Sequence, residues 1–261
     1  MIIKQEYPIL EYDDSRDVKV SAKELEKLTN LGIKYGVIDF CSETREELSK
    51  NYPSKIVGTF GGCGVAPTNV YEIDFNGTKI ISHQGVIGSP LAAAIMEDLI
   101  AMGCDTIVAV GDCGVLDKTI KRAGIIVPTG AVRAEGTSYH YVAPSRIIQY
   151  SPEIIQKACD FYTSKNIPFV KGLTWTTDAM YRETEDAVKL RQQEGCICVE
   201  MENATFGAVA QYYGVKFFQI LYGGDCLDTT TWDARPWCSP EERLKTKYEF
   251  SKLAMELVLK I

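Results

Sequence analysis

Short apolar runs rich in β-branched residues alternate with amphipathic helical patterns along most of this chain, and this alternation constrains the fold more than any other feature. Such runs are typical of strands that are buried on both faces. They lie at residues 78–82, 106–110, 125–128, 169–174, 197–201 and 217–222. The helical patterns lie at residues 90–102, 152–165, 183–194, 204–213 and 240–259. The alternation predicts an α/β fold, a three-layer sandwich around a β-sheet.

Local signals refine this prediction. The pair Asn76-Gly77 is a strong turn signal and predicts a hairpin within residues 70–85, so we expect a mixed sheet and not a purely parallel one. The glycine-rich stretch 58–64 lacks the fingerprint of a phosphate loop and is interpreted as a second hairpin turn. Ser239 followed by Pro240 predicts the start of the last helix.

The domain organisation follows from the absence of any linker after residue 35. Residues 1–35, with a helix expected over residues 21–31, are interpreted as an N-terminal extension. Residues 36–261 are expected to form one domain, since α/β folds of this length often have a single core.

Composition excludes several function classes. Apolar residues make up 46% of the chain and charged residues 24%, and the formal net charge is −7. An acidic chain without a Lys/Arg stripe is not expected to bind nucleic acid. No apolar run reaches the ~20 residues that span a bilayer, and the N-terminus lacks a signal-peptide core. We therefore expect a cytoplasmic protein that does not contact membranes.

The nine cysteines are odd in number and scattered, so we expect reduced thiols. Cys196 and Cys198 are the only close pair, and no further ligands follow nearby. We predict neither a metal site nor an organic cofactor.

Two carboxylates, Glu200 and Glu202, stand where an apolar strand gives way to a helix. Charged residues are rare at such a place unless they are paired or functional. If the strand extends that far, alternation puts both on one side with Met201 opposite. Such a pair can bind the vicinal hydroxyls of a ribose. The same pattern is also consistent with one helix-capping acid and one ion pair.

Two further segments follow strand ends. Asp225 comes after an apolar run and Gly223-Gly224, and an acid there can protonate a leaving base or form a simple turn. Met180 and Tyr181 can form the walls of a slot for a planar base, although such side chains are often part of the core.

Glycine loops at 85–90 and 111–114 also follow buried strands, which is where α/β proteins bind ligands. Gly85, Gly111 and Asp112 are therefore candidate binding residues. A plain strand-to-helix turn is the alternative for each loop.

Taken in order, these segments resemble the nucleoside phosphorylases of the hexameric purine and uridine phosphorylase type. The resemblance covers roughly residues 35–260. Its motifs are the glycine loops 85–90 and 111–114, and the segments 132–140, 177–181, 199–202 (Val-Glu-Met-Glu) and 224–225. The resemblance implies the fold of that family and the cleavage of the N-glycosidic bond of a nucleoside in nucleoside salvage.

The resemblance also implies roles for single residues. Met201 and Glu202 would hold the ribose hydroxyls, with Glu200 beside them. Asp225 would protonate the imidazole nitrogen of a leaving purine, with Arg243 as its partner. In the same way, Met180 and Tyr181 would line the base pocket.

The nucleophile stays open, because this chain departs from the family at the phosphate site. Ala109 and Asp112 stand where the family has an arginine and a hydroxyl residue, and only Arg45 is kept from the early phosphate loop. Phosphate as co-substrate, bound by Arg45 with Arg133 or a neighbouring subunit's arginine, is one hypothesis. Water activated by Asp112 or a glutamate, which would make the protein a nucleosidase, is the second. A non-catalytic nucleoside-binding module is the third.

The resemblance also bears on which base the protein accepts and on how its subunits assemble. The segment 132–140 resembles the uridine branch, but an insertion that reads uracil is missing between Tyr181 and Val199, and the pair Asp225 and Arg243 favours purines. A homodimer or homohexamer with shared active sites is implied by the family alone.

Overall fold

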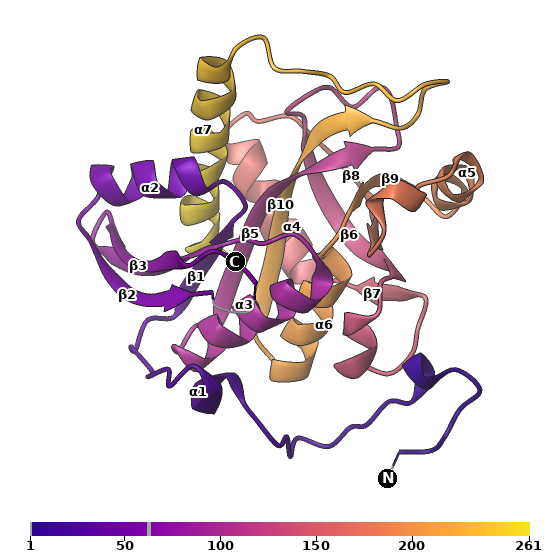
Figure 1. Ribbon diagram of the computed structural model, residues 1–261. Helices are drawn as coiled ribbons and strands as arrows, with labels where there is room; N and C mark the ends of the chain where they lie inside the picture. The colour runs from indigo at the N-terminus through magenta and orange to yellow at the C-terminus, as the bar shows by residue number, and fades with distance from the viewer. Residues whose placement is uncertain (1, 62–63) are drawn as a thin grey trace.

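The computed structural model describes residues 2–61 and 64–261, and the residues it describes form a mixed α/β fold around a ten-stranded sheet (Figure 1). The strands are β1 (Tyr35–Asp39), β2 (Ser54–Phe60), β3 (Thr68–Phe75), β4 (Thr78–Gln84), β5 (Thr106–Val115), β6 (Ile125–Ala134), β7 (Ile147–Gln149), β8 (Phe169–Thr177), β9 (Cys196–Glu200) and β10 (Lys216–Cys226). The helices are α1 (Ala22–Leu25), α2 (Ser42–Asn51), α3 (Ser89–Ala101), α4 (Pro152–Ser164), α5 (Glu185–Gln193), α6 (Asn203–Tyr213) and α7 (Pro240–Val258), with short 3-10 turns η1 (Pro8–Leu10), η2 (Thr137–His140) and η3 (Met180–Arg182). The predicted α/β class is confirmed.

The sheet is mixed, as predicted. Strand β5 lies parallel to β1 and β10 but antiparallel to β9, and β10 is antiparallel to β6. Strands β5, β10, β6, β8 and β9 pair in a closed circuit, because β9 returns to β5 through Gly114 opposite Val199. Strands β1, β4, β3 and β2 extend from β5 as an open arm, and the short β7 pairs with β6. This closure brings the ends of β5, β9 and β10 to one place.

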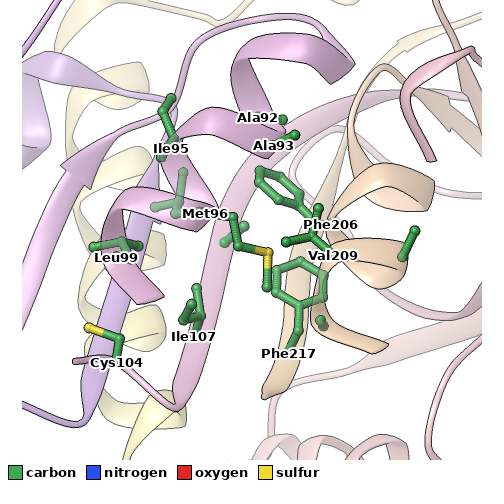
Figure 2. Packing of buried hydrophobic residues seen from close by; sticks show 14 of the residues in the cluster. Ala92, Ala93, Ile95, Met96, Leu99, Cys104, Ile107, Phe206, Val209 and Phe217 are labelled. Carbon is green, nitrogen blue, oxygen red and sulfur yellow. The ribbon is translucent and has the colours of Figure 1, made fainter. Parts of the chain in front are cut away.

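The alternation of side chains along β5 shows why the strands read as continuous apolar runs. Ile107 and Ala109 face the core under α3 and α6, whereas Val108 and Val110 face the core under α4 and α7. Figure 2 shows the first of these cores, where Met96 of α3 lies near Phe206 and Val209 of α6. A strand buried on both faces has no polar side, so its sequence lacks the period of two.

The turn at Asn76-Gly77 forms as predicted. Both residues have positive φ, at 55° and 87°, and Phe75 pairs with Thr78 across the turn. Positive φ at both positions defines the hairpin turn for which Asn-Gly is selected. Around the glycine-rich stretch, β2 and β3 pair antiparallel as a hairpin requires, and Gly62 and Cys63 lie outside the described residues.

The helix expected over residues 21–31 is much shorter than predicted. Ser21 caps it through a reciprocal bond with Glu24, but α1 ends at Leu25 and Lys27 has a φ of 52°. Leu28 and Leu31 then pack against the core beside α3. Tertiary packing of these two leucines therefore overrides local helix propensity.

The N-terminal segment, drawn in indigo in Figure 1, runs along the outside of the molecule below α6, and its turn η1 contacts η2. The guanidinium of Arg16 stacks on the ring of Tyr212, 3.8 Å from its centroid, and Tyr12 donates a hydrogen bond to the carbonyl of Tyr141. No helix in the described part of the chain is both long and apolar enough to span a membrane.

Candidate active site

One cavity of about 300 Å³ lies where β5, β9 and β10 end and α6 begins. Among the residues that line it are seven that the sequence singled out: Gly111, Asp112, Met180, Glu200, Met201, Glu202 and Asp225. Phe40, Ile87, Glu183 and Gln219 complete much of the wall and were not predicted. Residues from six separate stretches of the chain therefore meet in one place.

Glu200 is the last residue of β9 and is buried. Its carboxylate accepts hydrogen bonds from the Thr176 hydroxyl at 2.6 Å and from the backbone N–H groups of Glu202 and Asn203 at 2.7 and 2.5 Å. These N–H groups belong to the first turn of α6, where an anion is favoured. Glu200 thus fixes the strand-to-helix corner, which matches the helix-capping alternative for this residue.

Glu202 also lines the cavity, but its position does not come from strand alternation, because β9 ends at Glu200. Glu202 is the residue before α6, and its Oε1 accepts a hydrogen bond of 2.7 Å from the N–H of Gly88. Gly88 precedes α3, so the carboxylate joins the starts of two helices. Met201 lies between the two acids, and its carbonyl accepts a hydrogen bond from the Ser89 hydroxyl.

The two glutamates are electrostatically linked. Burial raises the pKa of Glu200, although the hydrogen bonds that its carboxylate accepts act in the opposite direction. Burial, and then the charge of Glu200, raises the pKa of Glu202. The pair therefore retains a proton at pH values where an exposed glutamate is fully ionised.

Asp225 lies near the end of β10 on another part of the cavity wall. Its Oδ2 accepts a hydrogen bond of 2.6 Å from the indole N–H of Trp232. Glu183 is close by, and burial together with the charge of Asp225 raises the pKa of Glu183 to about 7. The sequence offered no signal for this pairing, because Glu183 was interpreted only as the first residue of a helix.

Met180 and Tyr181 differ in their exposure and in their position relative to the cavity. Met180 lines the cavity with 40% of its surface exposed, whereas Tyr181 is 94% exposed and does not line it. Both belong to the short turn η3, which follows β8. In this protomer only Met180 is placed to contact a ligand in the cavity.

Arg243 does not lie beside Asp225. Its guanidinium forms an ion pair with Glu43 of α2 at 3.0 Å on the molecular surface. The reason is topological, because Arg243 lies in the first turns of α7, and α7 packs against α2. The group that contacts Asp225 in this structure is Trp232.

Two of the four candidate phosphate residues, Arg45 and Gly85, do not line the cavity. Arg45 is buried, and its guanidinium donates to the Asn69 carbonyl and to the Gln84 side chain. Gly85 packs against Phe40, since a Cβ at Gly85 would lie 2.6 Å from that ring. Only Gly111 and Asp112 of this group line the cavity, and Asp112 is exposed.

Arg133 is engaged elsewhere as well. Its side chain donates to the Ser138 hydroxyl at 2.9 Å and to the Ala143 carbonyl at 2.8 Å, and it stacks on Tyr139. It therefore stabilises the loop that follows β6.

All the charged side chains that line the cavity are acidic. Its acidic side chains are Asp112, Glu183, Glu200, Glu202 and Asp225, and in the described part of the chain no lysine, arginine or histidine lines it. Among the described residues there is also no group of three or more side chains suited to hold a metal ion. Such a site favours positive charge on its ligand, or positive charge that develops during a reaction.

The chain belongs to the phosphorylase superfamily, whose family model matches residues 34–261. This confirms the resemblance drawn from the motifs. Among curated relatives, the DeoD-type purine nucleoside phosphorylase of Caldanaerobacter subterraneus is 31% identical over 189 residues, covering 69% of this chain and 76% of the relative. The enzyme of the same name from Clostridium novyi is 28% identical over 184 residues, with the same coverage.

Solved structures show the same fold. Uridine phosphorylase from Vibrio fischeri superposes with a TM-score of 0.73 at 18% identity, covering 89% of this chain and 93% of that protein. Purine nucleoside phosphorylase from Toxoplasma gondii, in complex with immucillin-H, gives a TM-score of 0.69 at 18% identity, covering 93% and 98%. At this identity the structures establish the fold alone.

Proposed function

We propose that this protein cleaves the N-glycosidic bond of a purine ribonucleoside, with phosphate as the nucleophile, to give the free base and ribose 1-phosphate. The observation that carries this proposal is the convergence of Met201, Glu202 and Asp225 on one cavity that the fold builds from three separate strand ends. The names of the curated relatives support the same chemistry.

Glu202 is suited to bind the ribose. Its Oε1 is held by the N–H of Gly88, and its carboxylate lines the cavity, where a sugar hydroxyl can contact it. Because the carboxylate joins the starts of α3 and α6, it does not need to reorganise when the ligand binds. Preorganised acceptors of this kind stabilise charge that develops in the transition state.

Asp225 is suited to be the acid for the leaving base. Trp232 fixes one carboxylate oxygen, which leaves the other for the imidazole N7 of a purine. As the C1′–N9 bond breaks, its electron pair moves to the base, and Asp225, which reacts in its protonated form, transfers its proton to N7. Positive charge then develops on the ribosyl group beside Glu200 and Glu202, and the nucleophile adds to C1′ on the opposite face.

Purines are favoured over uracil by this arrangement, because an acid at N7 assists only a base that has an imidazole ring. The absence of a uracil-reading insertion between Tyr181 and Val199 agrees with this choice. The curated relatives cited above carry the purine name.

A second candidate function, hydrolysis by water, is favoured by the charge of the cavity. Arg45 and Arg133 are both engaged elsewhere, and Asp112 lines the cavity. Two like charges 4 Å apart cost about 4 kcal/mol at an effective dielectric of 20, so a phosphate dianion requires cations that these side chains do not supply. Water carries no charge, and Asp112 is placed to accept its proton.

Product analysis separates the two functions. Purified protein is incubated with inosine, adenosine, guanosine and uridine, each with and without phosphate, and the sugar product is identified by chromatography. Ribose 1-phosphate formed only with phosphate supports the phosphorylase, whereas free ribose formed at equal rates in both conditions establishes the hydrolase. Asp225→Asn protein, purified in parallel, controls for contaminating host enzymes. No cleavage of any nucleoside by the unchanged protein would contradict both functions.

A further inference from the structure

A second cavity, of about 530 Å³, adjoins the first at Glu183, which lines both. Most of its wall comes from α5 and from the loop after β10, and Lys118 and Glu183 complete it. The residues that matter for its chemistry are Val188 and Lys189 of α5, and Leu227, Thr230 and Trp232 of the loop. The proposed function gives this cavity no role.

The second cavity lies on the base side of the site. Leu227 and Trp232 follow Asp225 in the chain, and the Trp232 indole both bonds to Asp225 and lines the second cavity. By contrast, the contacts of Glu202 are with Gly88 at the start of α3, and neither residue lines the second cavity. A substituent can therefore reach the second cavity from the base but not from the ribose hydroxyls.

The geometry of the purine ring determines which of its substituents points to the second cavity. In a purine, N7 and the exocyclic group at position 6 lie on the same edge. If Asp225 contacts N7, the group at position 6 is directed to the neighbours of Asp225, which are Glu183 and Trp232. These two residues form the boundary between the cavities.

The second cavity has an apolar floor and an aromatic wall inside a polar rim. Val188 is buried and Leu227 half-buried, and together they form an apolar floor. The Trp232 side chain is 70% exposed, so its ring is available for stacking. In the rim, Lys189 pairs with Glu185 at 2.6 Å, and Asp228 accepts hydrogen bonds from the backbone N–H of Lys118 and from the Gln192 amide.

We infer that the second cavity binds a bulky aryl or alkyl group carried on the exocyclic nitrogen of the purine, so that the protein accepts N6-substituted adenine nucleosides. This inference rests on the proposed function, since it takes Asp225 as the group that contacts N7. The substituent stacks on Trp232 above Val188 and Leu227, while the ribose stays at Glu202.

The test compares adenosine with N6-benzyladenosine, measuring kcat/KM for cleavage and Kd by calorimetry. Two variants fill the cavity from opposite walls, Thr230→Trp on the loop and Lys189→Trp on α5. Their matched controls are Thr230→Ser and Asp186→Trp, the latter because Asp186 lies on α5 but does not line the cavity. We expect the unchanged protein to cleave both nucleosides with kcat/KM values within about threefold of each other. We expect each filling variant to lose at least about tenfold on N6-benzyladenosine alone.

The outcomes separate the two proposals. If the protein cleaves adenosine but neither cleaves nor binds N6-benzyladenosine, the inference is wrong and the proposed function stands. The same conclusion follows if the filling variants cleave both nucleosides as their controls do. Binding of N6-benzyladenosine that the filling variants abolish, without cleavage of either nucleoside, retains the second cavity as a binding site and refutes the glycosidic cleavage. If neither nucleoside binds, both proposals are wrong.

Discussion

The two ends of the cavity are built in different ways. Glu200 and Glu202 are buried and held by backbone N–H groups at the starts of α6 and α3. Asp225 and Glu183 are only half-buried, and the partner of Asp225 is an exposed tryptophan in a loop. The carboxylates proposed for the ribose are therefore fixed by the core of the fold, whereas the acids proposed for the base depend on loops that can vary without disturbing that core.

This difference has a functional meaning in the proposed reaction. Ribose is common to all ribonucleosides, so a rigid ribose site does not limit the range of bases that the protein can accept. Bases differ, and loops positioned by a rigid scaffold commonly carry specificity. The following predictions test whether the two ends are as independent as their construction indicates.

The largest effect is expected at Asp225. Asp225→Asn keeps an acceptor for the Trp232 N–H but cannot donate a proton to N7. We expect kcat/KM for inosine to fall by about 10²–10⁴, the range typical of general acid catalysis. Circular dichroism should show an unchanged fold. Activity within threefold of the unchanged protein would remove Asp225 from the mechanism.

Substitution of Glu202 is expected to have the next largest effect. Glu202→Ala removes the proposed ribose ligand, and we expect kcat/KM for inosine to fall by about 10²–10³. The loss should be smaller for 2′-deoxyinosine, which offers one hydroxyl fewer. Glu202→Gln, which retains an oxygen for the Gly88 N–H, is the matched control for lost packing. Equal losses on both nucleosides would show that Glu202 has only a structural role.

Stability should also depend on pH at this rigid end. Because the pKa of Glu202 is raised above 4.5 in the folded protein, the folded state binds more protons than the unfolded state as pH rises from that value. The free energy of unfolding therefore falls with rising pH through the folded pKa. We expect the decrease in Tm between pH 5 and pH 9 to be smaller in Glu202→Gln by a few degrees. An unchanged pH dependence of Tm would mean that Glu202 does not titrate in this range.

At the end of the cavity that is built from loops, we expect Glu183 to determine how activity depends on pH. The pKa of Glu183 is about 7, so its negative charge appears as pH rises through that value. Proton donation then leaves Asp225 ionised next to a second carboxylate, and we expect kcat/KM to fall by about three- to tenfold between pH 6 and pH 8. In Glu183→Gln this decrease should disappear. If kcat/KM of the variant still falls between pH 6 and pH 8, a group other than Glu183 causes the decrease.

The smallest effect is expected for Arg243→Ala. Arg243 pairs with Glu43 at the surface, and exposed ion pairs contribute about 0–1 kcal/mol. We expect kcat/KM to change by less than about twofold at the pH optimum. A loss above about tenfold would instead support the pairing of Arg243 with Asp225 that the family resemblance implies, and would require α7 to move during turnover.

Much of the fold could be predicted from local sequence. The predicted strand at 106–110 is the first half of β5, and the helix predicted at 152–165 is α4 within one residue. Ser239 caps α7 by accepting from the Glu242 N–H, as predicted. Such features depend on residues a few positions apart, so periodicity and turn chemistry contain the information. Strands β1, β2 and β7 were missed, because a glycine interrupts the apolar run in β1 and in β2 and because β7 has only three residues.

For the site, the sequence by itself determined which carboxylates stand at strand ends, because strand ends are local features. Only the tertiary structure decided their neighbours. Closure of the sheet by β9 against β5 brings Glu200 to the cavity, the loop after β10 brings Trp232 to Asp225, and packing of α7 on α2 leads Arg243 to Glu43. The reason is physical. A side chain's charge and shape are fixed by its identity, but its electrostatic partner is set by which distant elements the core packs together.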